Sequence, residues 1–239
     1  MKKIVIDISR LHPKAFKRGV GIYTRNLYET LNAKNAKRDA RKSQTPKMRN
    51  VKYFLRKARN EKYQTDLIHY PYFDPFFLTL PCRGRIPRIV TVHDLTPLKF
   101  PEHYPTGIKG GIKWQIQKYL LKKVDAIITD SENSKKDIIS IINYPETKIF
   151  PIHLAAGEEF KKSLVINHQS LAIKEKYQLP DAFLLYVGDL NWNKNLKALI
   201  RAFKKLQNSF KKLKLVFVGS AFENNNLREL KILKKLIDE

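Results

Sequence analysis

The 239-residue chain is 43% hydrophobic, which is enough to bury the cores of one large domain or two ordinary ones. Its only cysteine, Cys82, excludes a disulfide framework, and no Cys/His cluster has the spacing of a structural zinc site. A formal charge of +25 makes nucleic acid, an anionic membrane face and a phosphorylated small molecule candidate partners, although a solvated lysine-rich surface explains it equally well.

The N-terminus indicates neither secretion nor membrane insertion. The apolar run that follows Lys2 and Lys3 is interrupted at Asp7, which is too early for the core of a signal peptide. No stretch approaches the roughly 18 to 20 uncharged apolar residues that cross a bilayer. We therefore expect a cytoplasmic protein, either soluble or peripheral at the inner face of a membrane.

The first part of the chain alternates short apolar, β-branched segments with longer amphipathic ones, a pattern typical of βα units that form a parallel sheet. Strands are expected at 4–8, 66–70, 89–93 and 125–129. A glycine-containing loop at 18–21 leads into a predicted helix with Leu27 and Leu31 on one face, and a second helix is predicted over 114–124. These elements predict a first α/β domain over residues 1–160.

One segment, residues 34–62, does not fit this alternation. It holds twelve Lys or Arg residues against Asp39 and Glu61, and it has no strand-like run before Val51. A charge run of this kind is usually a solvated loop or a partly disordered arm. We therefore expect an irregular basic segment, with an electrostatic contact to anionic lipid or nucleic acid as the functional alternative.

A second domain is predicted after a break in the pattern at Pro151 and Gly157. We place a linker at 161–180 and a new βαβ unit at 181–239, with strands at 183–188 and 213–220 and an amphipathic helix between them. A doubly wound domain needs more than two strands. We therefore expect this second domain to be incomplete at Glu239.

The strand-end pair His93 and Asp94 is the most informative position in the first domain. Ligands gather at the carboxyl ends of parallel strands, where a His can move a proton near neutral pH and an adjacent Asp can orient its ring or a substrate hydroxyl. A packed, hydrogen-bonded histidine is the alternative interpretation. The proline-rich continuation at 95–105 predicts a rigid loop that walls a pocket.

Glycines at two other positions suit an anionic ligand. Gly19 and Gly21 let backbone amides approach a phosphate or sugar, although a tight turn explains them equally well and their spacing is not the dinucleotide pattern. Gly188 ends a strand, and Lys194 with Asn195 opens a helix, so an ammonium group and a helix N-terminus together suit a diphosphate. An ordinary exposed lysine is the alternative for Lys194.

Another strand end, at residues 129–134, predicts a helix cap. Ser131 or Ser134 is expected to accept a hydrogen bond from a helix amide. No nucleophile-elbow glycine pattern surrounds Ser131, so we do not interpret it as a nucleophile.

In their order along the chain, these segments resemble the retaining glycosyltransferases of group 1, also called family 4, and in particular mannosyltransferase-like members. The segments that carry the resemblance are RGVGIYTRNLYETL (18–31), DLIHYPY (66–72), TVHDLTPLKFPEHYP (91–105), VDAIITDSENSKKDI (124–138), KIFPIHLAAGEEF (148–160) and FLLYVGDLNWNKNLKALIRAFKKL (183–206). The resemblance implies the GT-B fold, in which two Rossmann-like domains face a cleft, the acceptor binding mainly to the first and the donor mainly to the second.

The resemblance also implies roles for the candidate residues. Gly19 and Gly21 would line the donor phosphates and the acceptor at the cleft, and His93 would lie beside the transferred sugar with Asp94 next to it. Gly188, Lys194 and Asn195 would bind the donor diphosphate, and Tyr23 and Tyr70 would lie on the acceptor side. The implied substrates are a nucleoside-diphosphate sugar and a glycan or lipid-linked acceptor, with no metal or other cofactor because cationic groups and helix N-termini neutralise the leaving diphosphate.

The chain departs from the family pattern in three places. Asp189 stands where many relatives carry an Arg, and the basic segment 34–62 occupies the region of a second strand. The glutamate-containing loop that holds the donor would lie beyond Glu239. Two alternatives remain: a noncatalytic subunit that needs a partner chain for the missing half, and a nucleic-acid-binding protein, which the charge alone supports without any recognised motif.

Overall fold

The structure is a computed structural model that describes residues 2–8, 19–38, 51–56, 65–82, 84–157 and 168–238. The chain forms two compact units, residues 1–161 and residues 162–239. Each unit is described by itself.

Unit 1 is built on a sheet of six parallel strands in the order β2-β1-β3-β4-β5-β6. The strands are β1 (Lys2–Asp7), β2 (Val51–Arg56), β3 (Leu67–Tyr70), β4 (Arg88–Thr91), β5 (Ala126–Thr129) and β6 (Ile149–Pro151). All four strands predicted in the first part of the chain are present, as β1, β3, β4 and β5. The α/β fold with a parallel sheet is therefore confirmed.

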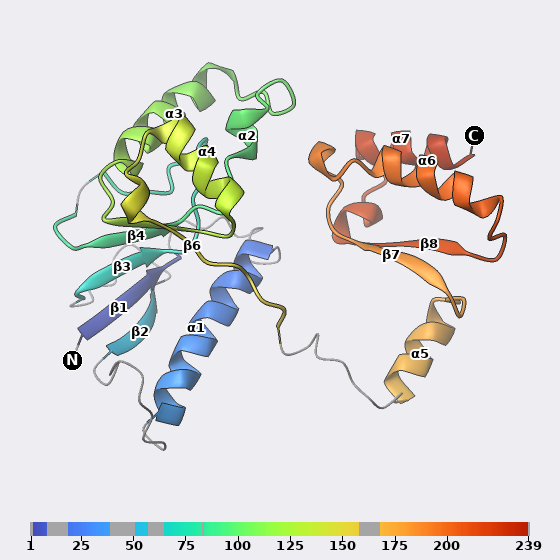
Figure 1. The fold of residues 1–239 in the computed structure, drawn as a ribbon, viewed down its shortest axis with the longest axis horizontal. Coiled ribbons are helices and arrows are strands. Elements are labelled where there is room, and N and C mark those ends of the chain that lie inside the picture. The colour runs from blue at the N-terminus through green and yellow to red at the C-terminus, as the bar shows by residue number, and fades with distance from the viewer. Residues whose placement is uncertain are drawn as a thin grey trace. The chain divides into compact units, whose positions relative to one another are not determined.

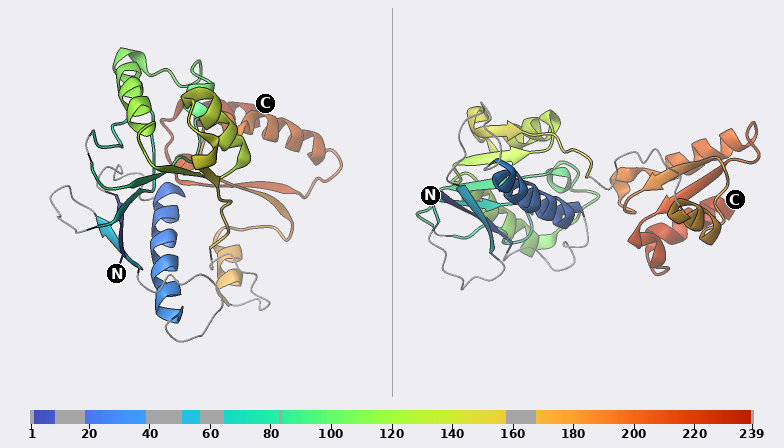
Figure 2. Two further views of the ribbon diagram at one scale, coloured as in Figure 1. Left: turned by 60° about the vertical axis from the view of Figure 1, so that its left-hand side comes forward. Right: turned by 90° about the horizontal axis from the view of Figure 1, so that it is seen from below.

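Helices cover both faces of this sheet (Figures 1 and 2). Helix α1 (Gly19–Arg38) lies on one face, and α2 (Thr96–Lys99), α3 (Gly107–Leu121) and α4 (Glu132–Ile142) lie on the other. Coverage of both faces explains why the central strands are almost continuously apolar. The larger core joins β3, β4 and β5 to α3 and α4, and a smaller one packs Ile6 and Ile8 against Leu27 and Leu31 of α1.

The interpretation of residues 34–62 as irregular is wrong over two described parts. Helix α1 continues to Arg38, and β2 pairs with the whole length of β1, from Lys2 opposite Val51 to Asp7 opposite Arg56. The physical reason is that Val51, Tyr53 and Phe54 favour strands, and the open edge of β1 offers them a hydrogen-bonding partner. Residues 39–50 and 57–62 lie outside the described part.

Two shorter features complete unit 1. Ser131 caps α4 as predicted, because its hydroxyl accepts a hydrogen bond from the Ser134 amide at 3.1 Å. After α4, a 3₁₀ turn (Glu146–Lys148) leads into β6. Strand β6 was not expected, since its three residues are too short to show a period.

Unit 2 contains α5 (His168–Lys176), β7 (Phe183–Val187), α6 (Leu196–Gln207), β8 (Lys214–Val218) and α7 (Arg228–Asp238). Strands β7 and β8 pair in parallel, as expected for a βαβ unit. Helices α6 and α7 lie along one face of this pair (Figure 1), where they bury Leu196, Ile200, Leu230 and Leu233. The predicted linker at 161–180 requires correction, because α5 falls within it and belongs to unit 2.

The loops after β7 and β8 approach each other closely. A Cβ atom on Gly219 would lie 2.1 Å from the Gly188 carbonyl oxygen, so no side chain fits at position 219. The Gly188 amide also donates a hydrogen bond of 2.9 Å to the Val218 carbonyl. Glycine at 219 is therefore required for the two strand ends to stay paired.

None of the helices in the described ranges is both long and apolar enough to cross a bilayer.

Candidate active site

The strand order reverses between β1 and β3, since β2 lies on one side of β1 and every later strand lies on the other. In open parallel sheets, the crevice for ligands opens at the carboxyl ends of the strands beside such a reversal. The first two turns of α1, the loop after β3 and the loop after β4 all come from this edge. They bring Tyr23, Pro71 and His93 together.

His93 is held by hydrogen bonds at both ring nitrogens. Its Nδ1 lies 2.7 Å from Asp130 Oδ2, and its Nε2 lies 3.2 Å from the Pro71 carbonyl oxygen. Both partners are acceptors, so a neutral ring can donate to only one of them and a protonated ring donates to both. The ring of Tyr23 packs edge-to-face against His93 with centroids 4.9 Å apart. The orientation of His93 is therefore determined by three elements.

A buried polar chain lies behind His93. The Thr91 hydroxyl contacts the Tyr23 hydroxyl at 3.2 Å and His69 Nε2 at 2.8 Å. His69 is buried in β3, and Thr91 is fully buried at the end of β4. Because each hydroxyl can both donate and accept, these three side chains satisfy one another without exposed partners.

Burial sets the protonation of two members of this chain. It lowers the pKa of His69 to about 4, and the positive charge of His93 adds to the effect, so His69 is neutral at neutral pH. Burial also raises the pKa of Tyr23, the negative charge of Asp130 raises it further, and the Thr91 hydrogen bond opposes both. Tyr23 is therefore a neutral phenol beside His93.

Asp130 has an unused acceptor. Its Oδ1 atom is buried and has no hydrogen-bond partner among the described residues. The backbone around it is held by neighbours: Ser134 Oγ donates to the His93 carbonyl oxygen at 3.0 Å, and His153 Nδ1 lies 3.1 Å from the Asp130 carbonyl oxygen. A buried carboxylate oxygen without a partner is costly unless a donor reaches it.

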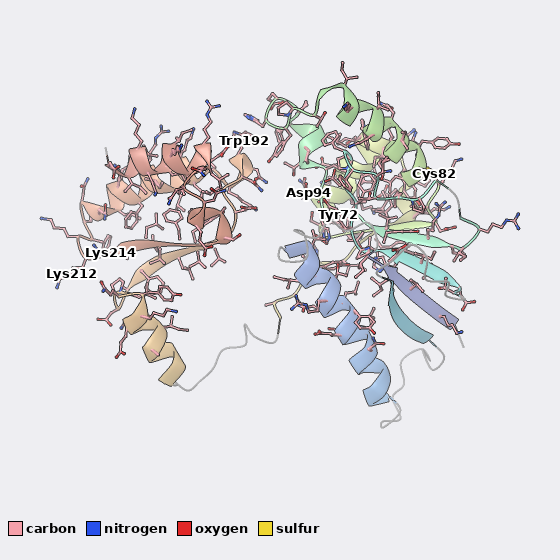
Figure 3. All side chains as sticks on the ribbon, turned by 180° about the vertical axis from the view of Figure 1, so that it is seen from behind. Tyr72, Cys82, Asp94, Trp192, Lys212 and Lys214 are labelled. Atoms are coloured by element: carbon pink, nitrogen blue, oxygen red, sulfur yellow. The ribbon has the colours of Figure 1, made fainter. Side chains whose placement is uncertain are left out.

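Of the two roles expected for Asp94, the orientation of the His93 ring is wrong, and the contact with a substrate hydroxyl stays a prediction. Asp94 is exposed, and its Oδ1 accepts a hydrogen bond of 2.9 Å from the Thr96 amide at the start of α2. Figure 3 labels it, together with Tyr72 on the loop after the neighbouring strand β3. The reason is local: an Asp two residues before an amide closes onto its own backbone. Asp130 orients the ring instead.

The two tyrosines predicted on the acceptor side have different surroundings. Tyr23 contacts His93, as described above. Tyr70, at the end of β3, is 4% exposed and belongs to the main hydrophobic core. Its position gives it a packing role and almost no surface for an acceptor.

Gly19 and Gly21 lie in the first turn of α1 and not in a loop before it. Gly19 is exposed with open space where a Cβ would be, and Gly21 is buried. The first amides of a helix have no partner within the helix. The amide of the exposed Gly19 therefore lies at the edge of the sheet that carries His93, whereas Gly21 is covered by its neighbours.

The donor-side candidates all lie at one end of unit 2. Gly188 follows β7, Lys194 ends a 3₁₀ turn (Trp192–Lys194) and is exposed, and Asn195 is the N-cap of α6 with φ of 48° and no side-chain capping bond. In Figure 3, Trp192 marks this end, and Lys212 and Lys214 mark the other. Lys194 therefore directly precedes the N-cap of α6, whose first amides have no partner within the helix.

A surface hollow of about 700 Å³ lies at the opposite end of unit 2. It is lined by residues 180–182 and 208–213, before β7 and after α6. Ligands of α/β units bind at the carboxyl ends of the strands, so this hollow is not the expected donor position.

Three site residues were missed in the sequence: Asp130, Thr91 and His69. Asp130 had a signal, since it follows a predicted strand as Asp94 does, but the polar residues after it suggested only a helix cap. Thr91 and His69 lie within strands and carry no local signal. In the described part of the chain, no three His, Cys, Asp or Glu side chains gather as a metal-binding group.

Comparisons with known proteins match both parts of the chain. The family model described as Glycosyltransferase Family 4 matches residues 34–155, which is half of the chain, and the model described as Glycosyl transferases group 1 matches residues 169–239.

Two proteins of Escherichia coli are similar over part of their length. The chain is 31% identical over 146 residues to O-antigen chain mannosyltransferase B, covering 59% of this chain and 36% of that protein. It is 29% identical over 119 residues to serotype-specific mannosyltransferase WbdA, covering 49% of this chain and 14% of that protein. The chain therefore spans only a minor part of these relatives.

A solved structure of a glycosyltransferase from Rickettsia africae ESF-5 matches 99% of this chain and 65% of its own, with a TM-score of 0.55 and 17% identity. At this identity the likeness concerns the fold.

Proposed function

This chain belongs to Glycosyltransferase Family 4, and on that premise we propose that it takes part in transferring mannose or a similar sugar from a nucleoside-diphosphate sugar to a glycan or lipid-linked acceptor, with retention of configuration. The names of the similar mannosyltransferases support the choice of sugar. With a lipid-linked acceptor, the protein would work in the cytoplasm, peripheral at the inner face of the membrane.

The hydrogen-bonded pair of His93 and Asp130 is the observation that carries the proposal. The pair lies at the carboxyl ends of the adjacent strands β4 and β5, and Asp130 keeps one buried oxygen without a partner in the described residues. This arrangement suits a polyhydroxylated substrate, because sugar hydroxyl groups can donate hydrogen bonds to a carboxylate and pack against an imidazole ring of fixed orientation. In this proposal His93 lies beside the transferred sugar and Asp130 positions it.

Donor binding is assigned to unit 2. Breaking the bond between the sugar and the diphosphate leaves negative charge on the diphosphate, and this charge must be stabilised. The Lys194 ammonium and the free amides of α6 supply a point charge and a helix N-terminus at the same place, next to Gly188 and Asn195. In this proposal these groups of unit 2 neutralise the leaving group, and no metal or other cofactor is used.

Thermal unfolding of the full chain with GDP-, UDP- and ADP-sugars at moderate salt tests the donor assignment. Saturable stabilisation by one of them is expected, since a ligand bound to the folded state raises its stability. Lys194→Ala should abolish this shift, and Lys197→Ala, which removes an exposed lysine one turn later, should retain it. Binding of DNA or RNA with a steep salt dependence, and of no nucleotide sugar, would instead favour the nucleic-acid-binding alternative.

A second function, that of a noncatalytic subunit with a partner chain, has one observation in its favour. Tyr186 packs toward α6 and α7, so Leu185, Val187 and the paired Val218 point to the opposite face of β7–β8, where they are exposed. Further α/β structure on a partner chain would cover this face. Coexpression with such a chain should then be necessary for sugar transfer, and transfer by this chain alone would reject the second function.

A further inference from the structure

Helix α3 has apolar residues on two opposite faces. Leu120 and Leu121 face the core, where each is almost fully buried. Ile108, Ile112, Ile116 and Tyr119 lie within about 80° of one another around the helix axis, on the side that faces away from it. Their exposed fractions are 85%, 58%, 39% and 59%. We call these four residues the outer face of α3.

The other long helix on this face of the sheet does not expose a stripe of apolar residues. Helix α4 covers the same face of the sheet, and its outward positions Glu132, Lys136 and Ser140 are polar. Isoleucine is among the residues that folding most often buries. Three exposed isoleucines in one stripe therefore indicate a surface that binds another molecule or a membrane.

The charge around the outer face is of one sign. Residues 103–124 contain five lysines and no acidic residue. Lys109 and Lys113 border the stripe on one side, and Lys118 and Lys122 border it on the other. Lys123 lies over the ring of Tyr119, 4.0 Å from its centroid. An apolar stripe bordered by lysines is the composition of helices that lie in the interface of an anionic bilayer.

We propose that the outer face of α3 docks on an anionic phospholipid surface, with the helix axis in the membrane plane. The isoleucines enter the boundary between headgroups and acyl chains, and the lysines contact the lipid phosphates. A second copy of the chain fits less well, since two such faces would bring lysines against lysines. A nucleic acid would pair with the lysines and leave the isoleucines exposed to water.

The position of α3 connects this surface with the candidate active site. Helix α3 is the crossover between the parallel strands β4 and β5, so it begins at the carboxyl edge of the sheet, the edge that carries His93. Ile108 is therefore at the active-site end of the stripe. The inference rests on the membrane contact included in the proposed function, and it names the surface that makes this contact.

Cosedimentation of the full chain with vesicles tests the inference. Vesicles of phosphatidylcholine with phosphatidylglycerol are compared with vesicles of phosphatidylcholine alone. The wild type should bind the anionic vesicles preferentially. Ile112→Asn with Ile116→Asn should weaken this binding by about tenfold or more, because the apolar insertion is lost while every charge remains.

A pair of matched variants tests the charge. Lys109→Gln, Lys113→Gln and Lys122→Gln together should weaken binding to anionic vesicles, whereas Lys197→Gln, Lys205→Gln and Lys231→Gln, exposed in unit 2, remove equal charge and should not. Circular dichroism confirms that each variant is folded. The inference is overturned if the isoleucine variant binds the vesicles as well as the wild type does, or if the wild type shows no preference for phosphatidylglycerol. It is also overturned if the wild type forms a dimer in solution and the isoleucine variant does not.

The donor titration separates this inference from the sugar-transfer proposal. Isoleucine variants that lose vesicle binding should keep the stabilisation by the nucleotide sugar. If vesicle binding depends on the outer face of α3 but no nucleotide sugar binds, the inference about α3 holds and the sugar-transfer proposal fails. If donor binding holds and vesicle binding does not depend on the outer face, the inference about α3 fails alone.

Discussion

Nδ1 of His93 lies 2.7 Å from Oδ2 of Asp130, although 37 residues separate the two in the chain. Each follows a strand of the parallel sheet, and the two strands, β4 and β5, are neighbours. The pair therefore exists only because the sheet places their carboxyl ends side by side. It gives His93 an anionic partner on one nitrogen while Pro71 accepts at the other.

Asp130 is a positioning residue for His93 in the proposed reaction. Asp130→Ala should lower kcat by roughly tenfold to a hundredfold with a smaller change in KM, and His93→Ala should lower it at least as much, since a His that handles charge or protons contributes at least this amount. Turnover is measured as sugar transfer to the acceptor by the wild type and by each variant.

A structural readout accompanies this prediction. ¹⁵N spectra of the imidazole should show loss of the Nδ1–H hydrogen bond in Asp130→Ala and retention of the fold. Asp94→Ala is the matched control, because Asp94 contacts the α2 backbone and not the ring. Loss of the Nδ1–H hydrogen bond in Asp94→Ala as well, or unchanged turnover in Asp130→Ala, would contradict the role of Asp130.

Buried His69 makes unit 1 sensitive to acid. Its pKa is lowered from the ordinary 6.5 to about 4, so between these values the unfolded chain binds more protons than the folded one. Stability should be complete above pH 6.5 and fall as the pH is lowered toward 4, by about 3 kcal/mol across the window.

Urea unfolding at a series of pH values checks the acid sensitivity. Trp192→Phe leaves Trp114, which packs against the core of unit 1, as the fluorescent reporter. His69→Gln in this background should remove most of the dependence between pH 6.5 and 4, because glutamine does not titrate. If the free energy of unfolding of this variant still changes with pH as in the wild type, other titrating groups cause the pH dependence.

Gly219 should be intolerant of any side chain. In Gly219→Ala, the added Cβ would meet the Gly188 carbonyl oxygen at 2.1 Å, so the loops after β7 and β8 must separate. We expect a loss of about 2 kcal/mol or more in the stability of unit 2, as for other overpacked sites.

Gly111→Ala provides the contrast for this prediction. No atom lies within 4 Å of the Cβ position at Gly111 in α3, so alanine should raise stability by about 1 kcal/mol through helix propensity. Thermal unfolding is followed by Trp192 fluorescence for unit 2 and by Trp114 fluorescence for unit 1. A neutral Gly219→Ala would show that the two loops are free to move apart.

Local patterns predicted most elements of this fold. Periodicity located β1, β3, β4 and β5 and the strands of unit 2, and the cap at Ser131 followed from residue type. The predictions failed where the partner decides the structure. Residues 51–56 form a strand because β1 has an open edge, and β6 is too short for periodicity to reveal it.

The sequence by itself determined the alternation of βα units and the presence of His93 and Lys194 in loops that follow strands, since these features depend on residue types a few positions apart. Only the tertiary structure decided which carboxylate meets His93. Asp94 is adjacent in sequence but closes onto its own backbone, whereas Asp130 is distant and comes from the neighbouring strand. The tertiary structure also decided that α3 buries one apolar face and exposes the other, because burial depends on what packs against a helix and not on its composition.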